Sequence, residues 1–309
     1  MFRIEDIFPK QEVVSFEEKK VNSKGNIKIT RLTFLSTFTL DYPENNRVVV
    51  YHYYPFKERY NNAIVILHGW KSSSLFFENT IAYIFARFGF HSFVFILPFH
   101  FDRTPQNRKN GELFFTLDQR HSIDAYKQAV IDLLNLADIL TKKGFQIGII
   151  GTSLGAIILN TLMGIDRRFR YGVSILGGGN IHRIIWEGIL GKFVVRYLKK
   201  RGITERDYEE VLKDYDTFLK EIRITGTIPI PRWDWFLLDP LTYAVFNHPR
   251  KIIMFNGIFD MIIPRRSVYE LKKALGDVQI YWLPAFHFTI FLFFPFIIYK
   301  SIVFFKKEI

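Results

Sequence analysis

Short apolar runs alternate with segments of helical periodicity over most of the chain. The apolar runs predict strands buried on both faces of a sheet, at residues 63–67, 91–97, 146–150, 171–176, 251–255 and 278–282. Helical patterns lie between them at residues 75–87, 122–142 and 156–163. This alternation predicts an α/β fold, in which a mostly parallel central sheet carries helices on both faces.

The pattern changes near the start of the chain and again after residue 176. Residues 31–40 and 47–54 are rich in Thr, Val, Tyr and Phe, which predicts antiparallel strands joined by a turn at residues 43–46. Residues 183–223 look helical with mixed charge, and residues 228–235 look irregular. We therefore predict a core domain of residues 1–179 and 246–309. Residues 180–245 are predicted to form an inserted helical cap over the carboxyl edge of the sheet, where ligands bind in such folds.

A candidate nucleophile lies where one predicted strand meets the next helix. Gly151-Thr152-Ser153-Leu154-Gly155 matches the pattern G-x-S-x-G directly after the apolar run 146–150. In this strand, turn and helix context the serine is displayed at the tip of a sharp turn. Gly151 and Gly155 are expected because a side chain at either position would collide with the neighbouring elements. Ser153 is thus predicted to be a catalytic nucleophile.

A serine hydroxyl needs a base to remove its proton and an acid to orient that base. His287 lies just past the last predicted strand and is our candidate base, whereas His248 precedes a strand and is the weaker choice. Asp260 follows the strand 251–255 and is the candidate acid. Asp239 and Asp234 are the competing carboxylates, and both precede that strand.

Acyl transfer also needs donors for the oxyanion. The backbone N–H of Leu154, next to the nucleophile, is one candidate. The second is the backbone N–H of Trp70, in the turn His68-Gly69-Trp70 that follows the strand 63–67. Gly69 lets the backbone approach closely, and His68 is expected to orient the turn rather than to react.

These motifs together resemble those of the α/β-hydrolase family over nearly the whole chain. The resemblance is carried by HGW at 68–70, GTSLG at 151–155, NGIFDMIIP at 256–264 and His287. Residues 177–187 and 239–243 are similar to a poorly characterised branch near dienelactone-hydrolase-like, acetyl-esterase-like and prolyl-oligopeptidase-like enzymes. The resemblance implies an α/β-hydrolase fold and ester hydrolysis through an acyl-enzyme, with no cofactor.

Composition and charge limit the ligands and partners that the protein is expected to bind. The chain has no cysteine, which excludes disulfides and thiolate metal sites. Its net charge of +12 is spread in ones and twos and accompanies no nucleic-acid motif, so no nucleic-acid partner is predicted. The N-terminus carries acids and lacks a long apolar run, so a secretory signal is not predicted and a cytoplasmic location is expected.

The C-terminal segment departs from the family pattern. Residues 288–299 are wholly apolar, but the run is shorter than the about 20 residues that cross a bilayer, and Pro295 is expected to kink a helix. A buried helix is the leading interpretation. A homodimer contact or a peripheral membrane contact through residues 288–305 is the alternative, since Lys306 and Lys307 would suit anionic headgroups.

The substrate is left open by these patterns. The 33 phenylalanines, many in the cap and tail, favour a small-molecule ester with an apolar acyl chain over a peptide. Thioesterase, lipase and peptidase activities use the same chemistry. A non-catalytic or membrane-associated binding protein on the same fold is the alternative from another class.

Overall fold

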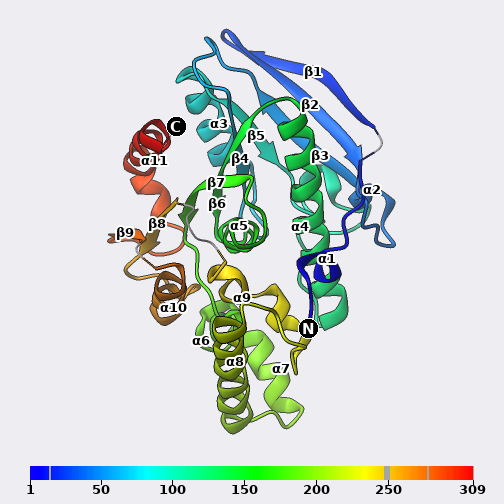
Figure 1. The fold of residues 1–309 in the computed structure, drawn as a ribbon, viewed down its shortest axis with the longest axis vertical. Helices are drawn as coiled ribbons and strands as arrows, with labels where there is room; N and C mark the ends of the chain where they lie inside the picture. Colours follow the sequence, from blue (N-terminus) through cyan, green and yellow to red (C-terminus); the bar gives the residue numbers. More distant parts are fainter. Residues whose placement is uncertain (14, 247–250, 277, 309) are drawn as a thin grey trace.

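The computed structural model describes residues 1–13, 15–246, 251–276 and 278–308. Within these residues nine strands form one sheet in the order β1-β2-β3-β5-β4-β6-β7-β8-β9 (Figure 1). Their bounds are β1 Phe16–Lys24, β2 Ile27–Leu35, β3 Arg47–Tyr53, β4 Asn62–Leu67, β5 His91–Phe95, β6 Gln146–Thr152, β7 Phe169–Ile175, β8 Lys251–Gly257 and β9 Gln279–Leu283.

Most of the sheet is parallel, as predicted. The strands from β5 to β9 pair in parallel, whereas β1, β2 and β3 pair antiparallel with one another and β3 pairs antiparallel with β5. The parallel strands are almost entirely buried, which explains their continuous apolar sequences. Their carboxyl ends therefore meet along one edge of the sheet.

The first part of the chain differs from its prediction. The strand expected over residues 31–40 is β2, which ends at Leu35, and the expected turn is a short helix, α2 (Pro43–Asn46). Strand β1 was not predicted, because nearly all its side chains are exposed and charged or polar, so it has no apolar pattern.

Helices cover both faces of the sheet. Helices α3 (Phe76–Arg87) and α11 (Phe294–Glu308) pack on one face, where their buried side chains share a core with Ile64, Val94 and Ile150. Helices α4 (Gln119–Lys142), α5 (Leu154–Ile165) and α10 (Arg265–Leu275) pack on the other. The predicted α/β architecture is confirmed.

Residues 180–245, here called the helical insertion, lie between β7 and β8 in the sequence. Its elements are α6 (Ile181–Glu187), η2 (Ile189–Gly191), α7 (Lys192–Lys200), α8 (Glu205–Thr225), η3 (Asp234–Leu238) and α9 (Pro240–Ala244). Figure 1 shows these helices gathered at one end of the molecule, with α9 next to α5. Helix α8 is attached through buried side chains that include Tyr215 and Ile222.

The C-terminal segment is only half buried. Ile297, Ile302 and Phe305 of α11 enter the core, while Tyr299 and Val303 are exposed, so the expected buried helix is buried on one side only. The expected kink is wrong. Pro295 is the second residue of α11, where a missing N–H breaks no helical hydrogen bond. Among the described residues, no helix has the length and apolar character needed to cross a bilayer.

Helix α3 contains a buried carboxyl group, that of Glu78. Its side chain is 4% exposed, and Oε2 has no hydrogen-bond partner among the described residues. Burial raises the pKa of this carboxyl from 4.5 to about 7. The folded state therefore keeps a proton that the unfolded chain releases as pH rises from 4.5 to 7, and stability falls over that interval.

We expect Glu78→Gln to stabilise the protein at pH 8 but not at pH 4. The charged form costs about 3 kcal/mol at pH 8, and the glutamine removes that cost. Urea denaturation of both proteins at the two pH values measures the difference. An equal effect at both pH values would contradict the assigned protonation.

Candidate active site

Ser153 lies between β6 and α5 in a strained conformation. Its φ is 53° and its ψ is −113°, which a residue with a side chain rarely adopts. A Cβ at Gly151 would lie 2.3 Å from the carbonyl oxygen of Gly155, and a Cβ at Gly155 would lie 2.7 Å from Leu67. Both glycines are therefore required by close packing, and the tight turn holds the serine at the carboxyl edge of the sheet.

Two further predicted residues meet Ser153 there. His287 follows β9, and its Nε2 lies 3.1 Å from the Ser153 Oγ. Its Nδ1 lies 2.8 Å from Oδ2 of Asp260, which follows β8. Because the carboxylate can only accept, the Nδ1 atom carries the proton and Nε2 accepts from the serine hydroxyl. The three side chains form a continuous hydrogen-bonded chain.

The Asp260 carboxylate is fixed on its other side. Oδ1 accepts hydrogen bonds from the backbone N–H groups of Ile262 at 2.8 Å and Ile263 at 3.0 Å. The loops after β8 and β9 are joined by a hydrogen bond from Phe259 N to Ala285 O at 3.0 Å. The acid and the base are thus held in one rigid unit.

The competing residues lie elsewhere. Asp239 is fully buried and accepts from the backbone N–H groups of Asn180, Ile181 and Leu241. Its burial raises the pKa of its carboxyl to about 6, and it fixes the start of the helical insertion. Asp234 lies in η3. His248 lies outside the described residues.

The turn after β4 comes close to the serine. A Cβ at Gly69 would lie 3.5 Å from the Ser153 Cβ. Within the part of the chain that the structure describes, the backbone N–H groups of Trp70 and Leu154 have no protein acceptor. Both donors are therefore free to bind another group beside Ser153.

Comparisons with known proteins agree with this geometry at the level of fold. No family model matches the chain, and no curated protein matches it. Among solved structures it is similar to acetyl xylan esterase 1 from Thermoanaerobacterium sp. JW/SL YS485, at 16% identity and a TM-score of 0.59 over 91% of this chain and 85% of that one. It is also similar to acetyl xylan esterase from Paenibacillus sp. R4, at 13% identity and a TM-score of 0.61 over 94% of this chain and 90% of that one. The similarity to the Pyrococcus furiosus esterase Pf2001 has 14% identity and a TM-score of 0.52, over 95% of this chain and 92% of that one.

The chain has the α/β-hydrolase fold. At these identities the likeness shows the fold alone. The turn that holds Trp70 lies between β4 and α3 of this fold.

Two buried histidines, His68 and His100, fix the turn that holds Trp70. His68 accepts a hydrogen bond from Leu97 N at Nε2, 3.1 Å away, and its Nδ1 donates to Gly69 O at 2.8 Å. His100 accepts from Lys71 N at Nε2, at 3.1 Å, and its Nδ1 donates to Pro98 O at 2.8 Å. Burial lowers the pKa of both, to about 4 for His68. Both rings are therefore neutral, and each accepts a backbone hydrogen bond at Nε2.

The segment after β5 makes further hydrogen bonds to the same turn. We call these contacts, together with those of His68 and His100, the clamp. Asn110 Nδ2 donates to Ser72 O at 2.6 Å, and Trp70 Nε1 donates to Gly111 O at 2.9 Å. Lys71 between these contacts has a φ of 52°, so the turn is held in a conformation that it would not adopt freely. No sequence pattern singled out His100, Asn110 or Gly111.

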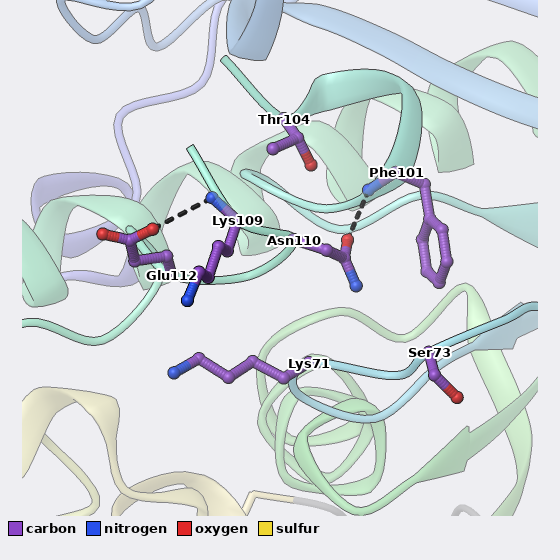
Figure 2. A pocket seen from close by; sticks show the side chains of 7 residues that line it. All are labelled: Lys71, Ser73, Phe101, Thr104, Lys109, Asn110 and Glu112. Carbon is purple, nitrogen blue, oxygen red and sulfur yellow. Dashed lines mark hydrogen bonds between the residues drawn. The ribbon is translucent and has the colours of Figure 1, made fainter. Parts of the chain in front are cut away.

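A cavity of about 530 Å³ opens beside the clamp. Its walls are formed by Lys71, Ser73, Phe101, Thr104, Lys109, Asn110 and Glu112 (Figure 2). The ammonium groups of Lys71 and Lys109 extend into the same open space, and Glu112 accepts from the Lys109 backbone N–H at 2.9 Å. The cavity therefore offers polar contacts next to the Trp70 turn.

Exposed apolar residues lie next to Asp260 and His287 in the sequence. Phe259 and Met261 lie on either side of Asp260, and Phe286 and Phe288 on either side of His287. The rings of Phe259 and Phe286 lie 5.5 Å apart. We call these four residues the apolar rim.

Among the residues that the structure describes, no group of three or more His, Cys, Asp or Glu side chains could hold a metal ion.

Proposed function

We propose that the protein is a serine hydrolase that cleaves carboxylic esters through an acyl-enzyme. The observation that carries the proposal is the hydrogen-bonded chain from Ser153 through His287 to Asp260, with the serine held in a strained turn. Strain and a fixed tautomer are costly in a protein that only binds, whereas both serve nucleophilic attack.

In the proposed reaction the Ser153 Oγ attacks the ester carbonyl while His287 Nε2 takes the hydroxyl proton. Asp260 stabilises the imidazolium that forms. The protonated His287 then gives its proton to the departing alcohol, leaving an acyl group on Ser153. A water molecule, deprotonated by His287, attacks this acyl-enzyme. The bond from the acyl carbon to the Ser153 Oγ then breaks, the Oγ takes the proton back from His287, and the carboxylic acid is released.

Charge develops on the carbonyl oxygen at each attack. The free backbone N–H groups of Leu154 and Trp70 beside Ser153 support their assignment as the two oxyanion donors. Because the clamp fixes the Trp70 turn before substrate arrives, little reorganisation is needed during the reaction.

The apolar rim supports a substrate with an apolar acyl chain. We assign residues 180–245 as a cap over a core of residues 1–179 and 246–309, because the insertion contacts the rim through a hydrogen bond from Ile189 N to Met261 O at 2.8 Å. p-Nitrophenyl esters of graded chain length test whether the substrate has an apolar acyl chain. Medium chains should give a higher kcat/KM than acetate, and a preference for acetate would contradict it.

A fluorophosphonate probe tests the proposed reaction class. Such probes phosphonylate serines activated by a neighbouring base, so wild-type protein should be labelled and Ser153→Ala should not. Ser73→Ala is a matched control, since it removes an exposed serine hydroxyl that makes no hydrogen bond to His287, and it should be labelled as strongly as wild type. Absence of labelling in folded wild-type protein would overturn the proposal and favour a binding protein.

We expect His100→Ala to lower kcat for p-nitrophenyl esters by about 10-fold or more with little change in KM. Removal of the acceptor for Lys71 N releases the turn that positions the Trp70 donor, and a lost donor costs about 100- to 1000-fold. His100→Gln retains an acceptor and should recover part of the loss.

His121→Ala is the control, because His121 Nε2 bonds to Leu113 O on the same segment without touching the turn. Equal losses in the alanine and glutamine variants of His100 would show that the ring acts only in packing.

A further inference from the structure

Helix α7 of the helical insertion has a concentrated positive charge. Lys192, Arg196, Lys199 and Lys200 lie on it, and residues 188–203 contain no acid. The spacing of these four residues places them on one side of a helix.

The cations border a hollow in the surface. A cavity of about 550 Å³ is lined by the four cations together with Trp186 and Val195. Lys199 pairs with Glu205 at 2.7 Å. Within the described residues Lys192, Arg196 and Lys200 have no ion pair, so three cations converge on this cavity without a counter-charge.

Exposed apolar residues lie on α7 and in the turn η2 just before it. Phe193 is 70% exposed and Leu190 is 51% exposed, and no residue of α7 is buried. Phe193 lies beside Lys200 at the border of the cationic side, because successive residues of a helix are about 100° apart. A short helix whose uncovered side carries both cations and an exposed apolar ring suits the headgroup region of a bilayer.

We propose that α7 and the preceding turn η2 dock on an anionic phospholipid surface. Headgroup phosphates occupy the cavity between Trp186 and the cations, and Phe193 and Leu190 enter the boundary with the acyl chains. A second copy of this chain would bring like charges together in this cavity. A small phosphate compound would leave the apolar side chains exposed. The lipid surface satisfies both features and agrees with the net charge of +12.

Docking at α7 would bring the apolar rim toward the same surface. The hydrogen bond from Ile189 N to Met261 O joins η2 directly to the loop that holds Asp260. Helix α11 takes no part in this contact. The docking does not depend on the proposed reaction, because it can be measured by binding alone.

Sedimentation of the full chain with vesicles tests the proposal. Binding to vesicles of equal parts phosphatidylglycerol and phosphatidylcholine should far exceed binding to pure phosphatidylcholine, and it should weaken as salt is raised. The variant Lys192→Gln/Arg196→Gln/Lys200→Gln should bind roughly 100-fold more weakly, at about 5-fold per cation.

Two matched controls separate the site from its net charge and apolarity. Lys20→Gln/Lys57→Gln/Lys273→Gln removes the same charge from scattered exposed positions and should bind nearly as wild type. Phe193→Ser should weaken binding by about 10-fold, whereas Ile224→Ser, at a residue 84% exposed on α8, should not.

Three results would overturn the proposal. One is equal binding to anionic and neutral vesicles. Another is an equal loss in the two triple variants, which would indicate attraction by net charge only. The third is calorimetric binding of inorganic phosphate that the α7 variant abolishes, with no vesicle binding, which would make this a site for free phosphate. Circular dichroism of each variant checks that it is folded.

Discussion

Ser153→Ala is expected to lower kcat for an activated ester by about 10⁵- to 10⁶-fold, with KM nearly unchanged. The serine Oγ forms the covalent bond in the proposed reaction, and alanine leaves nothing for His287 to deprotonate. His287→Ala should cost about as much, because the hydroxyl then has no base at 3.1 Å. Steady-state kinetics with p-nitrophenyl esters measures both losses.

The double variant Ser153→Ala/His287→Ala provides the internal control for this prediction. Residues that act as one unit have non-additive effects, so the double variant should be no slower than either single variant. Multiplied losses would mean that the two side chains contribute independently, which contradicts the acyl-enzyme reaction.

Asp260→Asn is expected to lower kcat by about 10⁴-fold. The asparagine fills the same space, but its amide can donate a hydrogen bond to Nδ1. The imidazole then adopts the tautomer with the proton on Nε2, where it cannot accept the serine proton. The same kinetic measurement applies, and the loss should be largest near neutral pH.

Asp239→Asn is the matched control for that substitution. Asp239 is also a buried carboxylate bound by backbone N–H groups, yet it does not contact His287. Its asparagine variant should lose stability rather than kcat. A comparable fall in kcat for the two variants would show that buried acids act here through folding alone.

The sequence was most informative where a function depends on local packing. A side chain at Gly151 would collide with Gly155, and one at Gly155 would collide with Leu67 in the neighbouring strand β4, so the turn around Ser153 requires both glycines of the motif. Asp260 and His287 were found because each directly follows an apolar strand, and parallel strands end at one edge of a sheet.

Features that depend on distant contacts could not be found in this way. His100 acts on the backbone of Lys71, which is 29 residues earlier, and no periodicity relates the two. The exposed side of α11 and the cavity beside α7 depend on which neighbours happen to cover a side chain. An apolar or basic run looks the same in the sequence whether it is covered or not.

Strand β1 has a consequence for how these molecules behave together. It forms the outer edge of the sheet, where unpaired backbone groups could accept a strand from another molecule. Its side chains include Glu17, Lys19 and Lys20, and its pairing with β2 is interrupted near Val21. Charge and an irregular backbone both discourage further pairing. Strand β1 therefore disfavours edge-to-edge pairing of two molecules and so lowers their tendency to aggregate. This effect does not depend on the chemistry at Ser153.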